Sequence, residues 1–139
     1  MIVRAAFVLA CLLAPALAAA DCQLPAGLHG RQMTNQSDPL YQPGNPHAGR
    51  LVQLEFQHTT YSLAPLGTSQ RFAGTYSYSR LAPHVGEIRF TEAFEGGVAR
   101  YRLLLTCLTG NGGHFVFTQD DGPVPPRQRQ NGGTWALTR

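Results

Sequence analysis

Lysine is absent from this chain of 139 residues, and only 14% of the residues are charged. All eleven basic residues are arginine, they lie scattered along the chain, and the formal net charge is +3. A protein that binds nucleic acid through its phosphates needs several cations on one face, so this distribution argues against a nucleic-acid partner. The hydrophobic share of 43% excludes a disordered or collagen-like chain and fits one globular domain.

The chain also lacks an apolar run of the ~20 residues that a membrane-spanning helix needs. Its most apolar stretch covers residues 5–13, follows Arg4 and precedes three alanines that end at Ala20. This order is typical of a secretory signal peptide that is cleaved after small residues. We therefore expect residues 1–20 to be a signal peptide, cleaved near Ala20. Residues 21–139 should then form a single domain, without a membrane span, that is periplasmic or secreted.

Cysteine is scarce, with three residues in the chain. Cleavage near Ala20 would leave Cys22 and Cys107, and an even number of cysteines in an exported chain predicts one disulfide. A free thiol or a metal ligand is the alternative, although no second Cys or His stands at ligand spacing from either residue. Acylation of Cys11 or Cys22, as in a lipoprotein, is a further alternative, but Asp21 does not fit that signal.

Helical periodicity is missing too, because no window of useful length keeps apolar residues at a helical spacing. Several windows instead alternate apolar and polar residues and are bounded by Gly, Pro, Asn or Asp. This pattern predicts antiparallel strands, each with one apolar and one polar face. The alternating apolar sets are Val52, Leu54 and Phe56; Phe72, Tyr76 and Tyr78; and Ile88 and Phe90.

Glycine-rich turns predict how the central strands pair. A two-residue turn at Gly96 and Gly97 places Phe90 opposite Leu103, so that two apolar residues meet on one face. Turns at 81–83 and 109–113 extend the pairing into a four-stranded meander over about residues 71–119. The further partners expected from these turns are Ile88 with Leu105, Gly86 with Cys107, Cys107 with Phe115, Leu105 with Phe117, Tyr78 with Gly86, and Tyr76 with Ile88.

Further strands are expected near residues 28–34, 49–57, 60–64 and 133–138, which brings the number to about eight. The sequence therefore predicts an all-β fold, a small antiparallel up-and-down meander that closes or nearly closes into a barrel, because closure removes exposed strand edges. An open β-sandwich is the alternative. Two proline-containing loops, 36–48 and 120–132, are long for such a scaffold and are candidates for binding.

Four of these segments resemble a known family. They are GTYSY at 74–78, GEIRF at 86–90, YRLLLT at 101–106 and GHFVF at 113–117. Together they are similar to the β-meander of small exported bacterial lipocalin-like (calycin-type) barrels, many of which have no assigned activity. The resemblance implies a barrel of this type and no particular ligand. Residues 72–76 also resemble avidin-type barrels, but those line their ligand site with several tryptophans and this chain has only Trp135, so no biotin site is implied.

Motifs for catalysis or metal binding are lacking. No two of the five histidines stand at the i, i+2 spacing that places both on one face of a strand, and there is no His-Glu-x-x-His helix. We therefore expect neither a metal nor a cofactor. The turn at 120–122 lacks the further ligands of an EF-hand. The stretch at 110–113 lacks the lysine and the helix of a phosphate loop, and there is no Gly-x-Ser-x-Gly elbow.

Candidate ligand-binding residues follow from the predicted inward faces. Tyr76, Tyr78, Tyr101 and Phe117 supply aromatic rings, which either line a cavity or fill a packed barrel. His58 continues the inward set of its strand and is placed either in a cavity or at the rim. Glu92 completes the set of six candidates.

Glu92 is expected on the inward face opposite Tyr101. A carboxylate in such apolar surroundings could act as an acid or a base. The structural alternative is a rim glutamate that is bonded to Tyr101 or paired with an arginine such as Arg71.

These features favour an exported, non-catalytic binding protein of the bacterial envelope. Its partner is a small apolar molecule in the barrel or an envelope protein on the two long loops. If aromatic rings fill the barrel, only the loops can bind. The alternative is a small barrel enzyme, an isomerase or hydrolase, that uses Glu92, His58 and Tyr101 around a cavity. A self-associating structural protein, which would present an exposed edge strand, is a third hypothesis.

Overall fold

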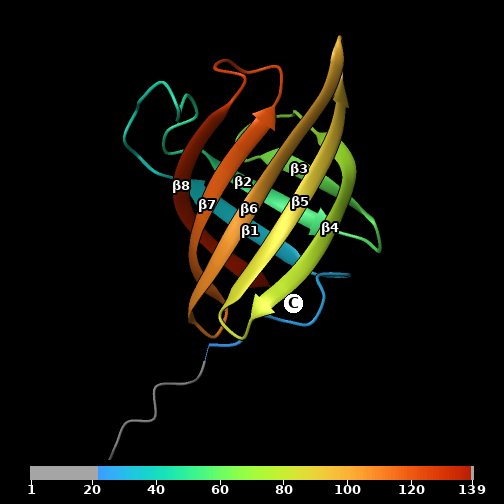
Figure 1. The fold of residues 1–139 in the computed structure, drawn as a ribbon, viewed down its shortest axis with the longest axis vertical. Helices are drawn as coiled ribbons and strands as arrows, with labels where there is room; N and C mark the ends of the chain where they lie inside the picture. Colours follow the sequence, from blue (N-terminus) through green and yellow to red (C-terminus); the bar gives the residue numbers. More distant parts are fainter. Residues whose placement is uncertain (1–21, 139) are drawn as a thin grey trace, which may run out of the picture.

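The chain folds into a closed antiparallel β-barrel (Figure 1). The computed structural model describes residues 22–138, so the expected signal peptide lies outside the described residues. Every strand pairs with the next one in sequence, and β8 pairs with β1 to close the barrel. This confirms the predicted all-β meander. The eight strands are β1 (Gln32–Ser37), β2 (Leu51–Phe56), β3 (Thr60–Pro65), β4 (Phe72–Ala82), β5 (Val85–Phe94), β6 (Gly97–Thr109), β7 (Gly112–Asp121) and β8 (Arg129–Thr138).

Two strand boundaries differ clearly from the prediction. The first strand begins later than predicted, at Gln32, because residues 22–31 lie against one end of the barrel. The last strand begins earlier, at Arg129. Gly133 lies inside β8, where a Cβ atom would overlap the Gln36 carbonyl oxygen on β1 and stand 2.6 Å from Phe115 Cζ. This glycine therefore permits close packing within a strand and does not mark a turn.

The central strands pair two residues away from the predicted register. Phe90 lies opposite Tyr101 instead of Leu103. Because side chains alternate with a period of two, a displacement of two leaves each of them on its predicted face. The other observed pairs are displaced in the same way: Ile88 with Leu103, Gly86 with Leu105, Glu92 with Ala99, Leu105 with Phe115, Leu103 with Phe117, Cys107 with Gly113, Tyr78 with Ile88, and Tyr76 with Phe90.

The displacement between β5 and β6 originates in their hairpin turn. Phe94 pairs with Gly97, so Glu95 and Gly96 form the loop in place of Gly96 and Gly97. Gly96 has a φ of 94°, in the left-handed region that favours glycine. The two adjacent glycines offer two positions for the turn, and the chain uses the earlier one.

Side chains fill one half of the barrel interior. This half lies at the closed end, defined as the end that carries the β2–β3, β4–β5 and β6–β7 turns; the opposite end is the open end (Figure 1). Burying a large apolar side chain stabilises the fold by ~1.5–3 kcal/mol. The filled half therefore supplies much of the stability of the barrel. Its buried residues include Met33, Phe56, Ile88, Leu105, Trp135 and Leu137.

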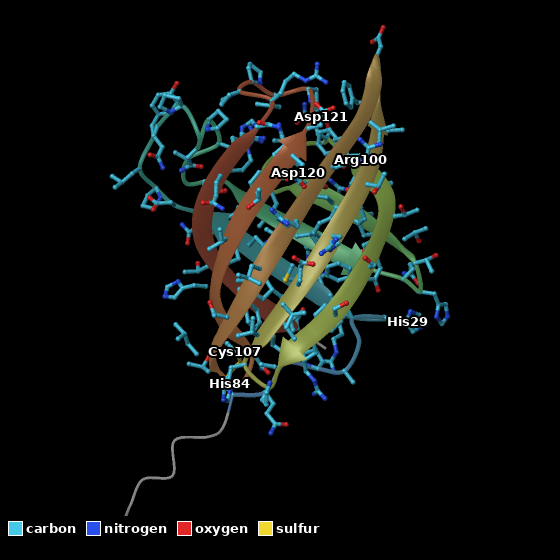
Figure 2. All side chains as sticks on the ribbon, in the orientation of Figure 1. His29, His84, Arg100, Cys107, Asp120 and Asp121 are labelled. Carbon is cyan, nitrogen blue, oxygen red and sulfur yellow. A yellow bond between two sulfur atoms is a disulfide. The ribbon has the colours of Figure 1, made fainter. Side chains whose placement is uncertain are left out.

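The segment 22–31 seals the closed end. Leu24 and Leu28 are each 1% exposed, although neither belongs to a strand. The Leu24 N–H donates to the Pro83 carbonyl at 2.9 Å. A disulfide joins Cys22 to Cys107 on β6, as predicted, with 5.8 Å between the two Cα atoms. Figure 2 shows Cys107 at this end of the barrel.

Replacing Cys22 and Cys107 together by serine should lower the free energy of unfolding by about 4 kcal/mol. The reason is that the disulfide spans a sequence separation of 85 residues and restricts the unfolded chain in proportion to the logarithm of that length. Urea unfolding followed by tryptophan fluorescence measures the change. Reduction of the wild-type protein should give the same loss. A difference below about 1 kcal/mol would contradict a stabilising role of this size.

Phe90 and Arg89 test the assignment of inward and outward faces. Phe90 is 2% exposed and packs against the rings of Tyr61 and Tyr101, with both pairs of centroids 4.8 Å apart. Phe90→Ala should cost about 3–5 kcal/mol of unfolding free energy, because it empties a packed site. Arg89→Ala, on the outward face, should cost less than about 0.5 kcal/mol. Equal losses in thermal or urea unfolding would show that the faces are misassigned.

Candidate ligand-binding cavity

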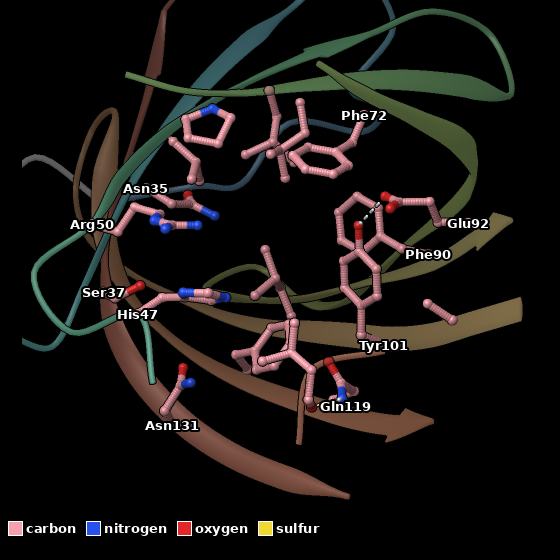
Figure 3. Close-up of a pocket in the computed structure, with 18 of the residues that line it drawn as sticks. Asn35, Ser37, His47, Arg50, Phe72, Phe90, Glu92, Tyr101, Gln119 and Asn131 are labelled. Carbon is pink, nitrogen blue, oxygen red and sulfur yellow. Dashed lines mark hydrogen bonds between the residues drawn. The ribbon is translucent and has the colours of Figure 1, made fainter. Parts of the chain in front are cut away.

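The open end of the barrel contains a cavity of about 230 Å³ (Figure 3). All eight strands contribute residues to its wall, as do the loops 38–50 and 122–128. A cavity of roughly 150 Å³ can take benzene, so this one has room for a molecule of roughly nine or ten non-hydrogen atoms. The barrel is therefore filled at one end and hollow at the other.

Most of the cavity wall is apolar. Phe90 and Tyr101 stack on one another, and the centroids of Tyr101 and Phe117 lie 5.6 Å apart. Such a wall can bury the apolar body of a ligand without leaving polar groups unpaired. The other apolar residues of the wall are Val52, Leu54, Leu63, Pro65, Phe72, Ala99, Leu103, Phe115, Pro123 and Val124.

Glu92 and Tyr101 lie on one side of the cavity (Figure 3), and Tyr61 completes a hydrogen-bonded cluster with them. The Tyr61 hydroxyl donates to Glu92 Oε2 at 2.8 Å. The Tyr101 hydroxyl lies 2.5 Å from that of Tyr61 and 3.3 Å from Glu92 Oε2. Burial raises the pKa of both tyrosines well above the usual range, so both hydroxyls stay protonated at physiological pH. Arg71, the other predicted partner of Glu92, donates instead to the Gln70 carbonyl.

Arg129 is a half-buried cation in the cavity wall. Its Nε and Nη2 atoms donate to Gln119 Oε1 at 3.3 and 3.1 Å, and its guanidinium carbon lies 5.3 Å from the ring centroid of Phe117. Gln119 is itself 5% exposed, and its Nε2 donates to the Val124 and Arg127 carbonyls at 3.1 and 3.0 Å. Gln119 therefore holds both the guanidinium and the β7–β8 loop in place.

Two buried side-chain atoms of the wall have no hydrogen-bond partner in the described part of the chain. Arg129 Nη1 and Asn35 Oδ1 are buried, and neither forms a hydrogen bond within residues 22–138. Arg129 also forms no salt bridge in the part of the chain that the structure describes. Burial lowers the pKa of its guanidinium, which nevertheless remains charged at physiological pH. An unpaired buried polar group costs about 1–3 kcal/mol, so these two groups lower the stability of the open end.

The β1–β2 loop places His47 and Arg50 in the cavity wall. Asn45 is fully buried in this loop, and its side-chain amide donates to two carbonyls of the same loop at 2.8 and 2.9 Å. Asn131 Nδ2 on β8 donates to the Gly44 carbonyl at 3.0 Å. These bonds fix the loop to itself and to the barrel, so His47 and Arg50 are held in place despite lying outside the strands.

The predicted ligand-binding residues divide between the two ends of the barrel. Glu92, Tyr101 and Phe117 line the cavity at the open end. Tyr76 and Tyr78 belong to the filled, closed end. Their hydroxyls donate to carbonyls outside the strands, that of Gln57 at 2.7 Å and that of Pro25 at 2.9 Å, respectively. Whether the three cavity residues bind a ligand stays a prediction.

His58 does not point into the barrel, contrary to the expected continuation of its strand's inward set. β2 ends at Phe56, and the alternation ends with it. His58 is exposed in the following turn, where its ring stacks on that of His29 with centroids 3.7 Å apart. The three residues expected to act together in an enzyme, Glu92, His58 and Tyr101, therefore do not form one site. Glu92 and Tyr101 lie at the opposite end of the barrel from His58.

Sequence reasoning missed the polar part of the cavity wall. The signal that could have found most of it is the alternation that predicted the apolar faces. On β7 the inward positions continue from Phe117 to Gln119, and on β8 they run back from Trp135 to Asn131 and Arg129. The missed residues are Asn35, Ser37, His47, Arg50, Gln119, Arg129 and Asn131.

No protein-family model matches this chain, and neither does any curated protein or solved structure. Within the described residues, no three His, Cys, Asp or Glu side chains are grouped so that they could hold a metal ion. Residues 22–138 include no helix with the length and apolar character needed to cross a membrane. The cavity itself is therefore the feature from which a function can be inferred.

His47 should make stability depend on pH. Burial, reinforced by the charges of Arg50 and Arg129, lowers its pKa below the ordinary value of 6.5. Below about pH 6.5 the unfolded chain therefore binds a proton that the folded protein takes up only at lower pH, and stability falls. We expect His47→Gln to lose less thermal stability than the wild type between pH 7.5 and pH 5.5. Parallel curves of melting temperature against pH for the two proteins would contradict this.

Proposed function

We propose that this protein is an exported, non-catalytic binding protein of the bacterial envelope that holds a small, largely apolar molecule in the open end of its barrel. The observation that supports this proposal is the cavity of about 230 Å³ between aromatic and aliphatic side chains. Unfilled apolar space destabilises a protein because dispersion contacts are missing. The filled closed end indicates that this sequence can pack a barrel interior, so the hollow end favours a ligand.

Export is inferred from two features of the chain. Residues 1–20 have the order of a signal peptide. The Cys22–Cys107 disulfide is typical of an oxidising compartment such as the periplasm or the cell exterior. A ligand-binding protein in that location would meet molecules that enter or leave the cell.

Binding is favoured over catalysis by the arrangement of the titratable groups. The Glu92 carboxylate is hydrogen-bonded to two tyrosines that stay protonated, and His58 lies outside the barrel. A general base must accept a proton from the substrate, whereas Glu92 Oε2 already accepts hydrogen bonds from both tyrosine hydroxyls. The Glu92 cluster is better suited to shaping and orienting one side of a binding site.

Ala99 and Ala93 provide a matched test of the proposal. Ala99 lies in the cavity wall and is 4% exposed, whereas Ala93 is exposed on the outward face of β5. The same change to phenylalanine should fill the cavity at Ala99 and leave it open at Ala93. Native mass spectrometry of each protein, isolated from its own cell envelope without refolding, measures whether a small molecule remains bound.

We expect a non-covalent adduct of small-molecule mass on the wild type and on Ala93→Phe, and its loss from Ala99→Phe. Circular dichroism should show that all three proteins are folded. An adduct retained on Ala99→Phe would contradict binding in the cavity. If the wild type carries no adduct and also fails to bind added indole, a neutral molecule of suitable size, the proposed function is wrong. The loops 38–50 and 122–128 would then be the surfaces to test for a protein partner.

A further inference from the structure

We infer that the molecule held in the cavity is a monocarboxylic acid with a compact apolar body, and that Arg129 binds its carboxylate. This inference rests on the proposed function and names the chemical class of the ligand. It is carried by Arg129 and Arg50 in the cavity wall, neither of which forms a salt bridge within residues 22–138.

Arg129 is positioned as an anion-binding group. Two of its donor atoms are committed to Gln119 Oε1, and Nη1 is buried without a partner. Gln119 is a neutral acceptor, so it orients the guanidinium without cancelling its charge. The planar guanidinium of arginine matches the geometry of a carboxylate, and a charge-assisted hydrogen bond is about twice as strong as a neutral one.

The surroundings of Arg129 add to the positive character of this side of the cavity. Arg50 and His47 lie in the same wall, and Arg50, like Arg129, forms no salt bridge within the described range 22–138. Asn35 is 5% exposed, and its Oδ1 has no hydrogen-bond partner among those residues. Arg50 and Arg129 supply the donors that a carboxylate needs.

The opposite side of the cavity limits the ligand to one acid group. Figure 3 shows Glu92 and Tyr101 across the cavity from Asn35, His47 and Arg50. A second carboxylate or a polyphosphate that reached this side would meet the Glu92 carboxyl group and the aromatic rings. An apolar body fits there, since Phe90 and Tyr101 form a stacked wall. The volume of about 230 Å³ admits roughly ten non-hydrogen atoms.

Phenylacetate and phenylacetamide separate charge from shape. The two molecules have nearly the same size, and at pH 7.5 only phenylacetate is negatively charged. Isothermal titration of the wild type should give binding of phenylacetate that is at least about tenfold tighter than that of phenylacetamide, the lower range for a charge-assisted hydrogen bond. The same titrations are then made on three arginine variants.

Arg129→Met keeps an apolar stem and removes the charge, and we expect it to bind the two probes with affinities within about twofold of each other. Arg129→Lys keeps the charge without the planar fork and should retain a reduced preference for phenylacetate. Arg102→Met is the matched control, because Arg102 lies on the outward face of β6 near Asp120. It should behave like the wild type. Thermal unfolding shows whether each variant is folded.

Equal binding of the two probes by the wild type would overturn the inference while leaving a neutral ligand compatible with the proposed function. A preference for phenylacetate that survives Arg129→Met, or that is lost equally in Arg102→Met, would also overturn it. If the wild type binds neither probe, the carboxylate inference fails. The adduct experiment with Ala99→Phe then decides separately whether the proposed function stands.

Discussion

Closure of the barrel by the pairing of β1 with β8 is the constraint on which the rest of the structure depends. A closed sheet has no free edges, so all of its strands enclose the same interior. Along every strand, inward-facing residues therefore alternate with outward-facing ones. Met33 on β1 pairs with Leu137, and two residues further along the same strands Asn35 pairs with Trp135. The inward set thus changes from apolar to mixed along one strand, and this change separates the filled end from the hollow end.

The charges at the open end are placed so that they do not neutralise one another. Glu92 accepts hydrogen bonds from tyrosine hydroxyls, and Arg129 donates to the amide oxygen of Gln119. No salt bridge joins Glu92 to Arg129 among residues 22–138. Because the hydrogen-bond partners of Glu92 and Arg129 are neutral, the cavity wall keeps one positive and one negative region. A bound molecule then has a preferred orientation.

The sequence predicted faces better than it predicted registers. Alternation assigns Phe90 and Phe117 to the interior whichever turn the hairpin uses, because a displacement of two residues leaves the face unchanged. The register depends on which of two adjacent glycines takes the left-handed conformation. Gly96 takes it, and nothing in the local sequence separates Gly96 from Gly97. The face predicted for His58 was wrong for a different reason. β2 ends at Phe56, and the alternation of residues does not show where a strand ends.

The polar side of the site was harder to predict for a related reason. Arg129 and Asn131 occupy inward positions of β8, but they precede Gly132 and Gly133, and adjacent glycines usually indicate a turn. The need for glycine at 133 comes from both neighbouring strands, because a Cβ atom would overlap the Gln36 carbonyl oxygen on β1 and the Phe115 ring on β7. These contacts depend on the β1–β8 and β7–β8 registers, which are tertiary information. His47 and Arg50 depend in turn on how Asn45 folds their loop.

The two ends of the barrel have different physical tasks, and each makes the other possible. A hollow end lacks dispersion contacts and contains unpaired polar groups, so it lowers the stability of a small domain. The closed end compensates with a packed interior and with a disulfide that lies at the opposite end from the cavity. Because a disulfide acts largely through the unfolded chain, it stabilises the whole barrel without constraining the cavity wall. Residues at the open end are therefore free to be chosen for a ligand, and a ligand that binds to Arg129 would return stability to the end that lacks it.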